Sequence, residues 1–188
     1  MSTSQLTTQS APQSATERRS AEAELRRLIA GFAPAAARLR LIGAMRRSLL
    51  KRLPTAHEVV YEYRDCFVIS YSPSGQGYEG VLGIRGSVDG VRLYFNQGKG
   101  LPDPEKLLQG SANARWIPVD GASTLARPAV VRLIDEALAR NQVPFARAGR
   151  GPVVIRSTLA KQRPKVKPAD VKKRGAAKRT VNPKGKPR

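Results

Sequence analysis

The residues with the clearest chemical capacity are the cations near the end of the chain. Residues 161–188 hold twelve Lys or Arg but a single acid, Asp170. Cations spaced along a chain neutralise phosphates and release counterions, so we expect salt-dependent, nearly sequence-independent binding of nucleic acid. The predicted phosphate contacts are Lys161, Arg163, Lys165, Lys167, Lys172, Lys173, Arg174, Lys178, Arg179, Lys184, Lys186 and Arg188.

Two features limit what this tail can do. It contains no aromatic residue, so base stacking is not expected from it. It also has no apolar anchor, which makes a membrane-surface role the weaker interpretation. A tail that only keeps the protein soluble explains the same composition and stays open as an alternative.

A second, smaller group of cations lies on a predicted helix over residues 34–52. At 100° per residue, Ile42 and Met45 fall on one side of this helix. Arg40, Arg47 and Lys51 fall together on the opposite side. This basic stripe is either an ordinary solvated face or a further set of phosphate contacts.

Catalytic residues are not apparent. The chain has one histidine, His57, and one cysteine, Cys66, and no signature surrounds Ser70 or Ser72. The Gly-Lys-Gly of residues 98–100 lacks the spacing and the Ser/Thr of a phosphate loop. We therefore predict no catalytic residue, no cofactor and no enzyme, and we expect Cys66 to be a small side chain that is buried or half-buried.

A metal site is equally hard to assemble. Glu58 and Glu62 share one face of a predicted strand, but their Cα atoms lie about 13 Å apart. Asp65 is near them, yet the surrounding domain is basic and repels cations. His57 is expected to be a packed or surface side chain, and no metal ligand is predicted.

Composition places the chain in a broad class. The formal net charge is +20, of which +11 belongs to residues 161–188, and hydrophobic residues make up 40% of the chain. The N-terminus has no apolar stretch typical of a secretory signal, and no window is apolar enough to span a membrane. We expect a soluble cytoplasmic protein without membrane insertion.

The hydrophobic periodicity predicts one α+β domain over residues 20–148, between disordered segments at 1–19 and 149–188. The expected helices cover residues 20–31, 34–52 and 128–141, with a short helical turn at 104–109. The expected strands cover residues 57–63, 67–71, 80–85, 91–95 and 115–118. Asp89-Gly90 predicts a hairpin, and Pro118 predicts that the last strand lies at an edge.

Several stretches of the chain resemble the YdhG-like family, whose domain has no agreed function. The long helix that ends in Leu-Pro before Glu58-Val59-Val60-Tyr61 resembles the family's helix-to-strand junction. Residues 95–110, with Leu101-Pro102-Asp103-Pro104 and Leu107-Leu108-Gln109-Gly110, resemble a loop of one subgroup, and Arg115 with its strand also fits. The resemblance covers about residues 24–142. It implies helices packed on one face of a curved, mainly antiparallel sheet, and some members are described as frataxin-like iron chaperones.

Three functional hypotheses follow. The first is a non-enzymatic binding protein whose basic tail adds non-specific nucleic-acid affinity, while the folded domain engages a partner of unknown kind. The alternative is iron binding and delivery by the folded domain, which the family resemblance alone implies. A small-molecule pocket between helix and sheet is the third.

Overall fold

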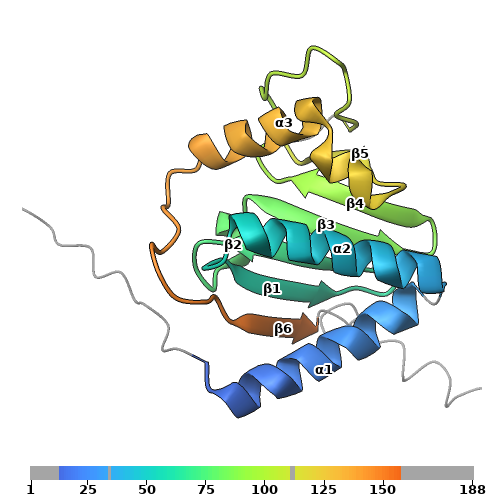
Figure 1. Cartoon of the computed structure of the whole chain (residues 1–188), viewed down its shortest axis with the longest axis vertical. Helices are drawn as coiled ribbons and strands as arrows, with labels where there is room; N and C mark the ends of the chain where they lie inside the picture. The colour runs from blue at the N-terminus through green and yellow to red at the C-terminus, as the bar shows by residue number, and fades with distance from the viewer. Residues whose placement is uncertain (1–12, 34, 111–112, 158–188) are drawn as a thin grey trace, which may run out of the picture.

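A computed structural model describes residues 13–33, 35–110 and 113–157 of the chain. Within these ranges three α-helices and six β-strands form an α+β fold (Figure 1). The helices are α1 (Ala15–Phe32), α2 (Ala36–Arg52) and α3 (Pro128–Ala139). The strands are β1 (His57–Glu62), β2 (Cys66–Ser72), β3 (Leu82–Ser87), β4 (Gly90–Phe95), β5 (Arg115–Pro118) and β6 (Val153–Ser157), with 3-10 turns η1 (Gly77–Glu79) and η2 (Ala122–Ala126).

The six strands form one curved, open sheet in the order β5-β4-β3-β2-β1-β6. Strands β1 to β5 pair antiparallel with their neighbours, as short polar turns such as Asp89-Gly90 require. Strand β6 pairs parallel with β1, so the sheet is mixed but mainly antiparallel. Strand β5 lies at one edge of the sheet, where a proline is tolerated although it has no N–H to donate to a neighbouring strand.

The hydrophobic core lies between the helices and one face of this sheet. Helix α1 packs over β6 and β2, and α2 packs over β3 and β4. Leu25 of α1, Ile42 of α2 and Leu133 of α3 are buried in the same cluster as Ile69 and Leu93 of the sheet. The predicted α+β fold, with helices on one face of a curved, mainly antiparallel sheet, is confirmed. The sole cysteine, Cys66, is buried as predicted.

Helix α1 begins earlier than the sequence analysis predicted. Ser14, rather than Ser20, is its N-cap, and it forms a capping box with Glu17. The Ser14 hydroxyl accepts a hydrogen bond from the Glu17 N–H, while the Glu17 carboxylate accepts one from the Ser14 N–H. The prediction of disorder through residue 19 is therefore wrong for residues 15–19, which are helical.

The boundary at residue 148 is also wrong, because residues 153–157 form β6 beside β1. The two chain segments that were expected to be disordered form hydrogen bonds with each other here. The Gln13 side chain donates to the Val153 carbonyl and accepts from its N–H, at 3.0 and 3.2 Å. Arg18 donates to the Gly151 carbonyl at 3.0 Å. These long-range contacts satisfy backbone groups that local sequence patterns do not reveal.

The expected helical turn at residues 104–109 does not form. The Asp103 carboxylate instead accepts hydrogen bonds from the N–H groups of Leu107 and Leu108, and Lys106 has a positive φ of 51°. Gln109 then pairs with Trp116 in an isolated bridge. A side chain that captures nearby backbone donors competes with helix formation, so the loop turns without one.

Gly151 offers a test of how firmly β6 belongs to the fold. A Cβ atom there would lie 1.9 Å from the carbonyl oxygen of Ala56, which is backbone and cannot move aside. Gly151→Ala is therefore expected to lower the free energy of unfolding by about 1–3 kcal/mol, measured by urea denaturation. Gly121→Ala, where a Cβ would meet only the Ser123 hydroxyl at 3.6 Å, is the control. Equal stability of the two variants would contradict the placement of β6.

Candidate nucleic-acid interface

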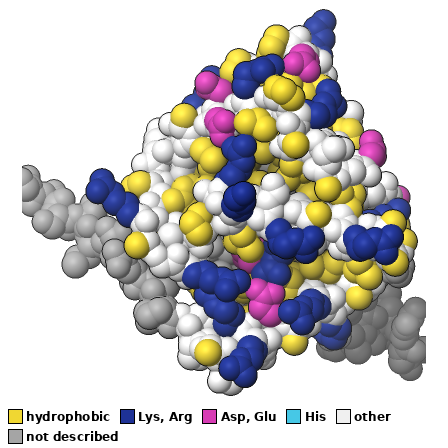
Figure 2. Space-filling model, viewed as in Figure 1, with side chains coloured by type: hydrophobic (Ala, Val, Ile, Leu, Met, Phe, Trp, Pro, Cys, Tyr) yellow, Lys and Arg dark blue, Asp and Glu magenta, His cyan; other side chains and the backbone are white. Residues whose placement is uncertain are grey.

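A groove of about 920 Å³ runs between α1 and α2 on the helical face of the molecule. Its charged lining consists of six arginines and a single acid, Glu22. Figure 2 shows Lys and Arg side chains gathered over the part of this face that α1 and α2 form. We call it the arginine groove. Its arginines are Arg18, Arg19, Arg26, Arg46, Arg47 and Arg150.

Helical periodicity explains why these side chains meet. On α1, Leu25, Leu28 and Ile29 point into the core, which leaves Arg19 and Arg26, seven residues apart, on an exposed side. On α2, the burial of Met45 and Leu49 similarly leaves Arg47 exposed. The two amphipathic helices thus place their polar sides around one groove.

Arg46 of α2 lines the groove, and its side chain links α2 to α1 and β1. Its guanidinium makes bidentate hydrogen bonds of 2.6 and 2.7 Å to both Glu22 of α1 and Glu58 of β1. Burial alone would lower the pKa of Arg46, but the hydrogen bonds to Glu58 and Glu22 outweigh burial and raise it. The hydrogen bond from Arg46 also lowers the pKa of Glu22. Because Arg46 is shared by two carboxylates, these three groups together carry one net negative charge, against the five other arginines of the groove.

Four other arginines of the groove have no such partner. Arg19, Arg26, Arg47 and Arg150 are all exposed, and within the described residues none of them makes a hydrogen bond or salt bridge. Arg18 has its partner in the Gly151 carbonyl. The unpaired guanidiniums leave their donors free for an anionic ligand, and guanidinium groups match phosphate geometry.

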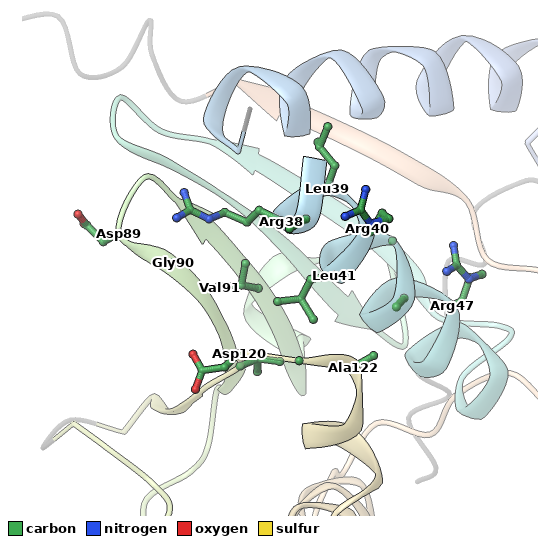
Figure 3. Close-up of a pocket in the computed structure, with 15 residues that line it drawn as sticks. Arg38, Leu39, Arg40, Leu41, Arg47, Asp89, Gly90, Val91, Asp120 and Ala122 are labelled. Atoms are coloured by element: carbon green, nitrogen blue, oxygen red, sulfur yellow. The ribbon is translucent and has the colours of Figure 1, made fainter. Parts of the chain in front are cut away.

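A second hollow of about 760 Å³ lies on the other side of α2, against the β3–β4 hairpin (Figure 3). It shares Leu39, Gly43 and Arg47 with the arginine groove, but Asp89 and Asp120 also line it. Arg38 reaches the hairpin and donates to the carbonyls of residues 87 and 88. Mixed charge makes this hollow less suited to an anion than the arginine groove.

The three residues of the predicted basic stripe, Arg40, Arg47 and Lys51, do not all line the same hollow. Arg47 lines both hollows, and Arg40 lines only the one with mixed charge. Figure 3 shows both side chains leaving α2 in directions away from Asp120. Lys51 is exposed but belongs to neither lining. The twelve predicted contacts of the tail, between Lys161 and Arg188, lie outside the described residues.

The groove also contains residues that the sequence analysis missed. Arg18 and Arg19 belonged to a segment that was predicted to be disordered, and only Arg26 was on a predicted helix; the pairing of α1 with α2 brings the three together. Arg150 carried no sequence signal, because it lies in the segment over residues 149–188 that was expected to be disordered. Its position depends on β6 returning the chain to β1.

The residues considered for metal binding are dispersed. Glu58 is buried in its ion pair with Arg46, and His57 is half-buried at the start of β1, where burial lowers its pKa. Across the described ranges no three His, Cys, Asp or Glu side chains form a group that could hold a metal ion. No observation on these residues thus favours iron over an anionic ligand.

Comparison with known proteins identified no relative. Neither a protein-family model nor a curated protein nor a solved structure matched the chain. The resemblance to the YdhG-like family therefore stays a prediction. None of the helices in the described part of the chain is long and apolar enough to cross a membrane.

Proposed function

We propose that this protein is a non-enzymatic nucleic-acid-binding protein that contacts the sugar–phosphate backbone without reading its sequence. The arginine groove supplies the contacts of the folded part through Arg19, Arg26, Arg47 and Arg150. The observation that carries this proposal is that these four exposed arginines share one groove whose single acid, Glu22, is held by hydrogen bonds to Arg46. The basic tail at residues 161–188 adds further electrostatic affinity.

A polymeric anion suits this groove better than a small one. A groove of about 920 Å³ that opens along two helices has room for several phosphates in sequence, each beside a different guanidinium. Contacts of this kind go to the backbone and carry no direct sequence information. We therefore assign the groove a positioning role on nucleic acid rather than base recognition.

The salt dependence of binding tests the groove and the tail separately. Each neutralised phosphate contributes about −0.9 to the slope of log K against log salt on duplex DNA. Four groove arginines then give a slope of between about −3 and −4 for a protein that ends at residue 160, and the full chain gives a steeper one. The measurement is fluorescence anisotropy with a labelled duplex of about 15 base pairs between 50 and 200 mM salt.

Circular dichroism confirms that the shortened protein is folded before its binding is compared. A shortened protein whose affinity does not respond to salt would contradict the groove. Equal affinity and equal slope for both proteins would remove the tail from the function.

A further inference from the structure

The face of the sheet opposite the helices carries a second set of basic and aromatic side chains. Strand alternation and the pairing register place Tyr61, Arg85, Arg92 and Arg156 in one row across β1, β3, β4 and β6. Tyr94 and Trp116, paired across β4 and β5, stand in the next row. We call these six residues the outer sheet face.

Aromatic residues are divided between the two faces by type. All four phenylalanines of the chain belong to the hydrophobic core or pack against it. Of the five tyrosines only Tyr71 is in the core, while the single tryptophan and the remaining tyrosines are outside it. Tyr and Trp combine an apolar ring with a polar tip and favour binding surfaces, so this division indicates a surface made for contact.

The charges on the outer sheet face all have the same sign. The acids of the described strands are Glu58 and Glu62, which alternate to the helical side, where Glu58 pairs with Arg46. No carboxylate of the described strands therefore opposes Arg85, Arg92 and Arg156 on their own face. This face is complementary to a polyanion.

Two cations of this face already contact its aromatic side chains. The Arg92 guanidinium lies 4.1 Å from the centre of the Trp116 ring, and Arg85 donates to the Tyr94 hydroxyl at 3.3 Å. Guanidinium planes and aromatic rings are both surfaces on which nucleobases stack. The arrangement is thus preorganised for bases as well as for phosphates.

One more aromatic stands at the border of this face. The η1 turn lies directly against Tyr61, because a Cβ atom on Gly77 would fall 1.6 Å from the Tyr61 hydroxyl oxygen. The same segment accepts a hydrogen bond from Arg156 at the Gly75 carbonyl, at 2.7 Å. Tyr78, the next residue of the turn, is 81% exposed. An exposed tyrosine beside a basic aromatic face is available for stacking.

We infer that the outer sheet face binds single-stranded nucleic acid. Bases stack on Tyr78, Tyr94 and the Arg92–Trp116 pair, and phosphates lie near Arg85 and Arg156. A single strand fits because its bases are unstacked and can reach a sheet, whereas duplex bases are enclosed in the helix. This inference rests on the proposed function, since it names a form of nucleic acid that the protein recognises on a surface separate from the arginine groove.

Trp116, as the only tryptophan of the chain, reports directly on this face. We expect an oligothymidylate of about 15 nucleotides to quench its fluorescence, while an abasic strand of the same length does not. Tyr78→Ala should weaken oligothymidylate binding about tenfold and leave duplex affinity unchanged. Val88→Ser, which removes an apolar side chain that is 67% exposed on the β3–β4 hairpin, should leave both affinities unchanged.

Tyr94→Leu provides a second variant in which a stacking ring is lost but a large apolar side chain is kept. Equal affinity and equal quenching for the oligothymidylate and the abasic strand would overturn the inference. So would unchanged oligothymidylate affinity in both tyrosine variants. If charge-neutralising the arginine groove leaves duplex binding unchanged while oligothymidylate still quenches Trp116, the groove fails and the outer sheet face stands.

Discussion

Replacing Arg46 with alanine is expected to lower the free energy of unfolding by about 3–5 kcal/mol. The substitution removes the salt-bridge partner of Glu58, whose side chain is 4% exposed, and it also removes the two hydrogen bonds that Glu22 accepts from the guanidinium. A carboxylate left buried without a cation keeps its full desolvation cost. The measurement is urea denaturation at neutral pH, followed by circular dichroism.

The neighbouring residue gives a matched control for this prediction. Arg47→Ala removes the same side chain from the same helix, but Arg47 is exposed and unpaired, so its cost should stay within about 0.5 kcal/mol. A combined Arg46→Met, Glu22→Leu and Glu58→Leu variant should recover most of the lost stability, because it leaves no charge buried alone. Similar losses for Arg46→Ala and Arg47→Ala would show that the buried network contributes little.

The Arg46 network also limits how strongly its two carboxylates compete for the other arginines of the groove. Glu22 and Glu58 carry two negative charges, yet both are directed at one guanidinium beneath the surface. The exposed arginines around them consequently keep their free donors. The network that joins α1, α2 and β1 thus carries one net negative charge, and the five other arginines of the groove outweigh it.

Local sequence patterns predicted the central elements of this fold well. Helices α2 and α3 have apolar residues at helical spacing, and α3 also has Pro128 at its first position. The Asp89-Gly90 pair marks the β3–β4 hairpin, and Pro118 marks the edge strand. In each case the deciding information lies within a few residues of the element itself.

The missed elements depend on partners far away in the sequence. Strand β6 contains a β-branched run at Val153-Val154-Ile155, but it becomes a strand because β1 offers a free edge. Basic composition around this run favoured a prediction of disorder. The start of α1 could have been predicted from Ser14 and Glu17, because their spacing is that of a capping box. The sequence analysis did not use this signal.

The residues of the candidate site also divide into those that local sequence patterns predict and those that depend on partners far away in the sequence. The exposed position of Arg47 could be predicted from the periodicity of α2 alone. Its proximity to Arg19, Arg26 and Arg150 could not, since it requires two helices and the return of the chain after β6 to meet at one groove. Sequence reasoning therefore identified cations correctly but could not select those that act together.

Neutralising the groove is expected to have the largest effect on binding. A variant with Arg19→Gln, Arg26→Gln and Arg47→Gln loses three phosphate contacts, each of which contributes about −0.9 to the salt slope on duplex DNA. The slope should become less steep by about 2.7, which corresponds to a loss of two to three orders of magnitude in affinity at about 0.1 M salt. Fluorescence anisotropy of the full chain with a labelled duplex measures both quantities.

Net charge alone predicts a different outcome, and a matched variant separates the two. Arg64→Gln, Arg127→Gln and Arg132→Gln together remove the same three charges from exposed positions where each arginine pairs with Asp65 or Glu105. If binding responds only to total charge, both triple variants lose affinity equally, and the groove has no special role. If the groove holds the phosphates, the matched variant keeps nearly all of its affinity and its slope, because its arginines already have carboxylate partners.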